Sequence, residues 1–514
     1  MSSKVLIAQL KVGMFVADLD RPWVDTPFLL QGFLIEDERQ IQDLRKHCEY
    51  VIVDRARSVG SEFAPALPND PSAPQREPAL VASAEVRSAA GRAEVKPAAA
   101  SLAIAPMQPL PAKRAVRVEE PIVSARSADG AVRAETPDAD PGGAFGFFFG
   151  LFRGNSKPKR EIGRPSAKIE PPRETKEEFA ARAALLPPGI AVQTYVDQVS
   201  VEQEVPKAKA VVGQASELLS KLLDDVRVGH TFEVERVEEI VLDMVESIVR
   251  NPDAAMWVAR LREEDATIYS HGLEVSVYLT SFGRHLGFPK EQLAKLAQIG
   301  LLLDIGKIRL LKGLLEKQGK LTEREFEVVK KHVQYGIDIL SETPKFDSQV
   351  LQAIAEHHER LNGTGYPKGL QTDEISIYGR MAGIADCFAA MTKPRPYAQA
   401  ISAYDALRTL ASWGGELFQE SLLQQFVSSV GVFPVGSLIE LSTGEIAFVV
   451  AHNKLRRLKP RVLIVTGPDK TRVPNPSMVD LLYDPKLGGD EPAFIKRGVP
   501  AGAFGLDVRD FYLA

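Results

Sequence analysis

An alanine- and proline-rich segment at residues 61–140 is the feature that most constrains what this chain can fold into. Of its 80 positions, 21 are Ala and 11 are Pro, and Phe63 is its only aromatic residue. Because so few large apolar side chains cannot offset the entropy lost on ordering, we expect a disordered linker over residues 58–172. The 514 residues therefore cannot share one core, and the ordered parts are expected on either side of this segment.

Three ordered modules are predicted around the linker. Residues 1–57 combine short apolar runs with turn residues and an expected helix at Asp37–His47, which is typical of a small α+β module. Residues 173–430 have helical patterning nearly throughout, and residues 431–514 alternate β-branched side chains, as a small β-rich module would. The expected fold class is therefore mostly α, with a multi-helix bundle as the central domain, a small α+β N-terminal module, a long disordered linker and a small β-rich C-terminal module.

Individual elements are also predicted from apolar spacing. Residues 232–249 place Val237, Val241 and Met244 on one stripe of a helix. Thr322 and Glu325 have the spacing of a capping box, so a helix is expected to begin there. Strands are expected at Lys4–Ile7, Met14–Val16, Tyr50–Val53, Ser437–Leu441, Ile446–Val450 and Arg461–Val465.

Composition excludes several classes of protein. Lys+Arg 63 against Asp+Glu 68 gives a net charge of −5, which excludes a chain-wide basic surface for DNA. Two cysteines, Cys48 and Cys387, cannot build a disulfide framework and fit a reducing cytoplasm. The apolar run Ala144–Phe152 has nine residues, and a transmembrane helix needs about 18 or more. We therefore expect a cytoplasmic protein with no transmembrane segment and no DNA partner.

A series of polar residues interrupts the apolar runs of the helical region. Its members are His271, Asp304, Lys307, His332, His357, His358, Glu359 and Asp386. Helices of a bundle can gather such groups around a metal centre, and a carboxylate among imidazoles can bridge two ions. Taken singly, each residue also fits a plainer role, such as a core histidine or an Asp304–Lys307 salt bridge. The joint pattern favours a metal centre.

The run HHERLNGTGYP, about fifty residues after LDIGK, resembles the HD-GYP family of cyclic di-GMP phosphodiesterases. This family lies within the HD superfamily of metal-dependent phosphohydrolases, and the resemblance covers residues 260–430. The opening LKVGMFV is similar to a domain often found upstream of HD-GYP domains. By this resemblance the metal ligands are His271, Asp304, His332, His357, His358 and Asp386. It also implies that Asp304 and Lys307 serve catalysis and that Lys307, Gly365, Tyr366 and Arg395 contact the substrate.

The sequence departs from the family pattern at three positions. Leu303 precedes Asp304 where the family has the histidine of its His-Asp pair, so one of the two ligand sets loses an imidazole. Thr267 stands where some relatives have a glutamate for a third metal, and Ala398 stands where many have a basic residue. A trinuclear centre is therefore not expected, and catalysis is in question.

Two functions follow from the resemblance. The first is a phosphodiesterase that uses one or two divalent ions, Fe or Mn, to hydrolyse cyclic di-GMP to pGpG or GMP in bacterial second-messenger signalling. The second is a degenerate member, impaired at Leu303, that does not hydrolyse nucleotides and acts in signalling by binding cyclic di-GMP or a related nucleotide, or by interacting with other proteins. Contacts with signalling proteins through the GYP loop at residues 365–367 and a homodimer stay open as further partners.

Overall fold

The computed structural model describes residues 2–20, 33–35, 38–55, 57–59, 176–261, 268–393, 399–453, 456–488, 490–506 and 511. Contacts divide the chain into two compact units, of which one contains the described N-terminal residues and the other the residues from 176 onward. The predicted linker beyond residue 59 lies outside the described residues, as do Thr267, Arg395 and Ala398. In the described part of the chain, no helix is long and apolar enough to cross a membrane.

The N-terminal unit is one antiparallel sheet with a helix. Its elements are β1 (Ser2–Leu6), β2 (Phe15–Leu19), β3 (Phe33–Leu34), α1 (Glu38–His47) and β4 (Tyr50–Asp54). The strand order is β1-β4-β2-β3, and Val16, Leu44 and Val51 are fully buried between sheet and helix. The expected α+β pattern is confirmed here; β3, with two residues, is too short to show alternation in the sequence.

The second unit begins with a bundle of helices that confirms the mostly α fold class. They are α3 (Lys176–Ala183), α4 (Val201–Arg227), α5 (Val234–Arg250), α6 (Pro252–Leu261), α7 (Ile268–Leu286), α8 (Lys290–Leu302), α9 (Lys312–Leu315), α10 (Glu323–Lys330), α11 (His332–Ser341), α12 (Ser348–Glu356), α13 (Ile377–Thr392), α14 (Ala403–Ser412) and α15 (Glu420–Val430). A 3-10 helix, η3 (Ile305–Arg309), follows α8. The predicted capping box is confirmed, since Thr322 and Glu325 exchange hydrogen bonds at the start of α10.

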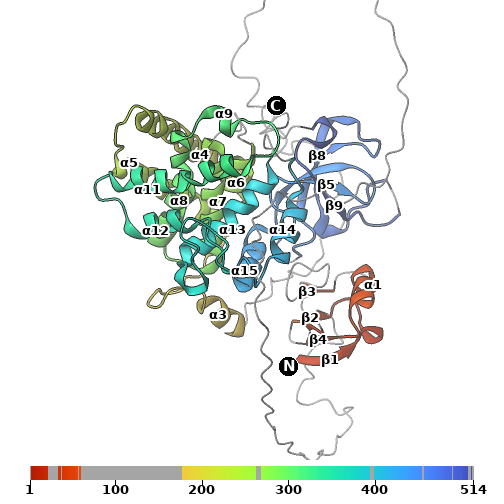
Figure 1. The fold of residues 1–514 in the computed structure, drawn as a ribbon. Helices are drawn as coiled ribbons and strands as arrows, with labels where there is room; N and C mark the ends of the chain where they lie inside the picture. The colour runs from red at the N-terminus through yellow and green to blue at the C-terminus, as the bar shows by residue number, and fades with distance from the viewer. Residues whose placement is uncertain are drawn as a thin grey trace, which may run out of the picture. The chain divides into compact units, whose positions relative to one another are not determined.

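Helices α7 and α13 lie at the centre of the bundle (Figure 1). Most side chains of α13 are buried, because its sequence IYGRMAGIADCFAAMT supplies small or apolar residues on every face. On α7 the aromatic rings of Tyr278 and Phe282 are buried, and they pack edge-on against Phe388 and Phe426. The two helices that carry His271 and Asp386 are therefore held by close packing on all sides.

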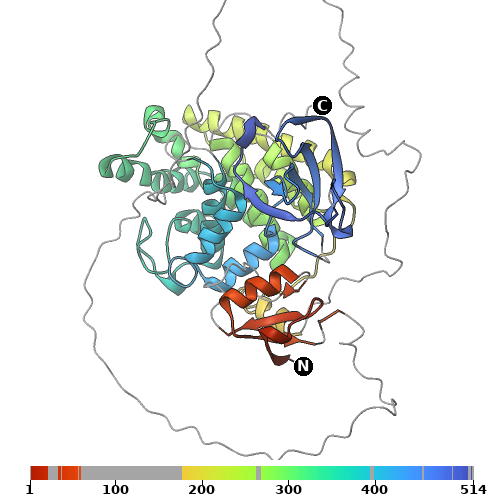
Figure 2. The same cartoon turned by 90° about the vertical axis from the view of Figure 1, so that its right-hand side faces the viewer.

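The C-terminal module is a five-stranded antiparallel sheet that contacts the bundle (Figures 1 and 2). Its strands are β5 (Leu438–Leu441), β6 (Ile446–Ala451), β7 (Arg461–Thr466), β8 (Arg472–Asp480) and β9 (Ile495–Val499), in the order β8-β7-β6-β5-β9. The three predicted strands are confirmed and form the interior of the sheet. Strand β8 was missed because it contains Pro474 and Pro476, which only an edge strand tolerates. Strand β9 was missed because its sequence IKRGV does not alternate apolar and polar residues.

The contact between η3 and α11 yields a stability prediction. A Cβ atom added at Gly306 would lie 1.9 Å from the His332 carbonyl oxygen, whereas one added at Gly313 in α9 would meet nothing within 4 Å. We expect Gly306→Ala to lower the free energy of unfolding by about 1–3 kcal/mol or more, because backbone must move to admit the methyl group. Gly313→Ala should be neutral or stabilising. Urea denaturation of both variants checks this, and equal stabilities would contradict the packing described.

Candidate metal centre

Two carboxylates and an imidazole from three separate elements form the first ligand group. His271 lies on α7, Asp386 on α13, and Asp304 immediately before η3. All three are buried, and one ligand atom from each lies within 4.8 Å of the others. His271 Nε2 is 2.7 Å from Asp386 Oδ1 and 3.8 Å from Asp304 Oδ2. A metal ion between these atoms would have three protein ligands.

Three imidazoles form the second ligand group. His332 is the first residue of α11, and His357 and His358 follow the last residue of α12. Their ring centroids are 5.7 Å apart for His332 and His357, 5.1 Å for His332 and His358, and 4.0 Å for His357 and His358. A nitrogen of each lies within 4.8 Å of the other two. Asp304 joins the groups, since its Oδ1 is 3.5 Å from His332 Nε2 and its Oδ2 faces His271.

The protonation of two imidazoles fits a metal ligand. His332 Nδ1 is 2.7 Å from the Val329 carbonyl, and His357 Nδ1 is 2.6 Å from the Ile354 carbonyl. A carbonyl oxygen only accepts, so Nδ1 carries the proton in both rings and Nε2 presents a lone pair. Burial lowers the pKa of His332 to about 4, so the ring is neutral near pH 7.

Three candidate ligand atoms among the described residues are buried without a hydrogen-bond partner. Within the described residues, Nε2 of His332, Nε2 of His357 and Oδ1 of Asp304 make no hydrogen bond. Buried polar atoms in native proteins are nearly always paired, and leaving one unpaired costs about 1–3 kcal/mol. A divalent ion would satisfy such atoms, two of which, His332 Nε2 and Asp304 Oδ1, lie 3.5 Å apart. The carbonyl bonds to Nδ1 are the outer contacts typical of metal-bound histidine.

Both carboxylates of the centre are held in the ionised form. Burial by itself raises the pKa of Asp304, but the ammonium of Lys307, 2.5 Å from Oδ2, and the nearby imidazoles hold it well below its usual value. Burial likewise raises the pKa of Asp386, and its hydrogen bond with His271 outweighs that effect and keeps the pKa low. Anionic oxygens with neutral imidazoles make a set that divalent transition ions accept.

The Asp304–Lys307 contact arises differently from the sequence prediction. The sequence predicted that Asp304 and Lys307 would share one face of a helix. Helix α8 ends at Leu302, however, and Asp304 is the N-cap of a separate 3-10 helix, η3. Side chains three residues apart eclipse one another in a 3-10 helix, which brings Lys307 directly over the carboxylate. Leu303 is fully buried within the apolar core. It offers no donor atom, so the first ligand group contains one imidazole.

The segment after His358 is tied back to the centre by hydrogen bonds. The buried Glu359 carboxylate accepts from the backbone N–H groups of Lys368 and Leu370, at 2.7 and 3.0 Å. Gly365 packs so closely that a Cβ atom there would lie 2.4 Å from Glu359 Cα. The Tyr366 ring consequently stacks on His358, with centroids 4.6 Å apart. Sequence reasoning included Glu359 in the polar series but missed this anchoring role, for which an acidic residue next to two ligands was the available signal.

The chain is similar to known proteins along much of its length. The HD domain family matches residues 229–422, and a domain of unknown function (DUF3391) matches residues 2–136. A cyclic di-GMP phosphodiesterase of Pseudomonas aeruginosa is 31% identical over 303 residues, covering 59% of this chain and 73% of that protein. This chain belongs to the HD-GYP family. The six residues predicted as metal ligands are the members of the two groups that the fold brings together.

Two further relatives match the HD-GYP region. A 3'3'-cGAMP-specific phosphodiesterase of Vibrio cholerae is 32% identical, covering 41% of this chain and 40% of that protein. A cyclic di-GMP phosphodiesterase of Thermotoga maritima is 41% identical, covering 24% of this chain and 34% of that protein. The HD domain identifies a protein that depends on a divalent metal.

The unpaired nitrogens predict a measurable response to metal. Mn²⁺ at a hundred times its dissociation constant should raise the free energy of unfolding of the wild-type chain by about 2.7 kcal/mol. His332→Ala should lose most of this increment, because it removes a ligand atom. His285→Gln is the matched control, since the Nε2 of His285 is already bonded to Gln425 at 3.0 Å. Urea denaturation with and without Mn²⁺ distinguishes the two, and an undiminished response of His332→Ala would contradict the assignment.

Proposed function

We propose that this HD-GYP protein hydrolyses cyclic di-GMP to pGpG or GMP, with one or two ions of Fe or Mn in the centre. The observation that carries the proposal is the pair of ligand groups that face one another across Asp304. Bound divalent ions would polarise a phosphoryl oxygen and lower the pKa of a water molecule. In a bacterium such an activity would end a second-messenger signal.

Among the described residues, we propose Lys307 as the one that meets the substrate phosphate. Its Nζ contacts the buried Asp304 carboxylate while 21% of its side chain stays exposed, so it lies between the centre and solvent. A fixed cation at that position neutralises negative charge that develops on a phosphodiester during displacement. Asp304 has the complementary role, because its two oxygens face both ligand groups and set their separation.

The GYP loop is proposed to form the substrate-facing wall beside His358. Tyr366 covers the His358 ring, and the Glu359 carboxylate fixes the backbone on the far side of the loop. An aromatic face next to a phosphate site can stack on a nucleobase. Gly365 leaves backbone rather than side chain next to the centre. We propose Arg395 as a further phosphate contact from the resemblance of its motif.

Leu303 is expected to weaken the first ligand group without removing catalysis. His271, Asp304 and Asp386 are three protein ligands, a number with which catalytic metal sites often leave one position open for water or substrate. The matched relatives are named as phosphodiesterases, which does not favour a binding module without activity. We propose cyclic di-GMP rather than 3'3'-cGAMP as the substrate. The chain covers 73% of the Pseudomonas aeruginosa relative, which is named for cyclic di-GMP, and only 40% of the Vibrio cholerae relative, which is named for 3'3'-cGAMP.

The proposal predicts activity in the Mn²⁺-loaded full-length chain, purified without oxygen. Cyclic di-GMP should be consumed faster than 3'3'-cGAMP, and chromatography of the products should show pGpG or GMP. His358→Ala should abolish turnover, and Lys307→Met should lower kcat by about 10²–10³-fold because it removes a fixed charge from the transition state. Lys331→Met, at an exposed position beside the ligand His332, is the control and should keep wild-type kcat.

Leu303→His separates the two functional hypotheses. If the wild-type chain hydrolyses cyclic di-GMP, the added imidazole should tighten metal binding and change kcat modestly. A wild-type chain that binds cyclic di-GMP but never hydrolyses it, together with activity in Leu303→His, would refute the proposal in favour of a binding module.

A further inference from the structure

A second buried group of charges lies one helical turn from His271 and is not part of either ligand group. Glu274 on α7 is 1% exposed, and its carboxylate is 2.9 Å from Lys393 Nζ and 3.6 Å from Arg260 Nε. The Tyr278 hydroxyl donates to it at 2.9 Å. We call these four residues the Glu274 cluster. With two cations and a hydroxyl around it, the Glu274 carboxylate is already neutralised and is not itself a metal ligand.

The Glu274 cluster ties together the helices that carry the first ligand group. Lys393 directly follows α13, which carries Asp386, and it reaches α7 at two points. One is Glu274, and the other is the carbonyl oxygen of Ser270, to which Lys393 Nζ donates at 3.3 Å. Ser270 immediately precedes His271. Lys393 therefore fixes the backbone on the N-terminal side of His271 while Glu274 fixes the turn on its C-terminal side.

A buried cluster of this kind is costly, which argues for a role. Burial raises the pKa of Glu274, but the charges of Lys393 and Arg260 outweigh it and keep the carboxyl ionised. Buried ion pairs contribute little net stability compared with apolar side chains of the same volume, although breaking one is strongly destabilising. Their better-attested effect is to fix one geometry, and here the geometry fixed is the distance between α7 and α13.

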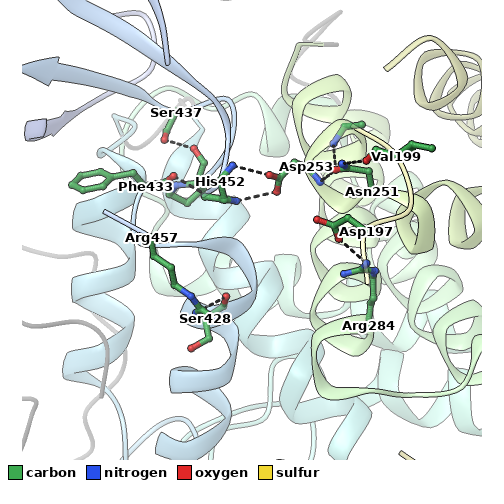
Figure 3. Close-up of polar contacts among 12 residues, drawn as sticks. Asp197, Val199, Asn251, Asp253, Arg284, Ser428, Phe433, Ser437, His452 and Arg457 are labelled. Carbon is green, nitrogen blue, oxygen red and sulfur yellow. Dashed lines mark hydrogen bonds and ion pairs between the residues drawn. The ribbon is translucent and has the colours of Figure 1, made fainter. Parts of the chain in front are cut away.

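The cluster also connects the centre to the C-terminal sheet through helix α6. At the start of α6, Asp253 accepts hydrogen bonds from the backbone N–H of His452 at 2.8 Å and from its ring Nδ1 at 2.9 Å (Figure 3). At the other end of α6, Arg260 contacts Glu274. The turn before β5 packs directly on this arginine, since a Cβ atom added at Gly436 would lie 2.8 Å from Arg260 Cδ.

We propose that Glu274 is a positioning residue for His271. The C-terminal sheet supports the metal centre indirectly, because it holds Arg260 against the Glu274 carboxylate. Only 11% of the His271 side chain is exposed to solvent, so its orientation is set by the neighbouring helices. Outer contacts of this kind typically change metal affinity about 10–100-fold. With Leu303 in place of an imidazole, the first ligand group depends on three residues, and misplacing one of them removes a third of the set.

The first experiment titrates Mn²⁺ into the chelator-stripped full-length chain. Glu204→Gln is the matched control for Glu274→Gln: Glu204 is also 1% exposed, pairs with Arg250 at 2.7 Å, and accepts from Ser247 at 2.8 Å. Both variants should unfold at lower urea concentration. Glu274→Gln should weaken Mn²⁺ binding about 10–100-fold, and Glu204→Gln should leave it within about twofold of wild type. Wild-type affinity in Glu274→Gln, or the same loss in both, overturns the proposal.

A charge-preserving substitution separates positioning from folding. Lys393→Met should weaken Mn²⁺ binding, whereas Lys393→Arg should retain most of it because the cation still reaches both the Glu274 carboxylate and the Ser270 carbonyl. Equal Mn²⁺ affinity in Lys393→Met and wild type overturns the role of Lys393. This inference rests on the proposed metal centre, but Mn²⁺ affinity is read without substrate. A failure here is therefore distinct from a failure to hydrolyse cyclic di-GMP.

A pair of glycines tests the part played by the C-terminal sheet. Gly436 and Gly502 both have a positive φ, +81° and +77°, so alanine introduces similar backbone strain at each. Only at Gly436 does the added Cβ displace Arg260, because nothing lies within 4 Å at Gly502. Gly436→Ala should weaken Mn²⁺ binding and lower kcat with KM little changed, and Gly502→Ala should do neither. Equal Mn²⁺ affinities of the two variants overturn the link through Arg260.

Discussion

The buried carboxylate of Asp304 is the constraint on which the rest of the structure depends. It lies at the break between α8 and η3, where one oxygen faces His332 and the other faces His271 and Lys307. A buried anion requires cations around it, and a single ammonium neutralises only one side. The five other residues of the two groups come from α7, α11, α13 and the end of α12, and the packing of these helices brings His271 and His332 within 4 Å of that carboxylate.

Residues around the candidate ligands control the position and protonation of the ligand side chains. Backbone carbonyls orient His332 and His357, the Glu359 carboxylate holds the loop that places Tyr366, and the Glu274 cluster holds α7 against α13. A single helical bundle thus serves both as the hydrophobic core of the domain and as the frame of the metal site.

Much of this could be predicted from the sequence, because the information was local. The capping box at Thr322, the apolar stripe of α5 and the polar series all depend on spacing along the chain. The contact between Glu274 and Lys393 could not be predicted, because the two residues lie more than a hundred positions apart and neither belongs to the polar series. Strand β8 was missed for a different reason: its prolines argue against a strand unless its edge position in the sheet is known.

The magnetic coupling between bound ions tests the central role of Asp304 most directly. At saturating Mn²⁺ both ligand groups should fill, and electron paramagnetic resonance should show two spin-coupled ions per chain, because the two oxygens of Asp304 face His332 of one group and His271 of the other, at 3.5 and 3.8 Å. Asp304→Ala should lose the coupled signal. Two magnetically independent ions in the wild-type chain, or an unchanged coupled signal in Asp304→Ala, would contradict the account.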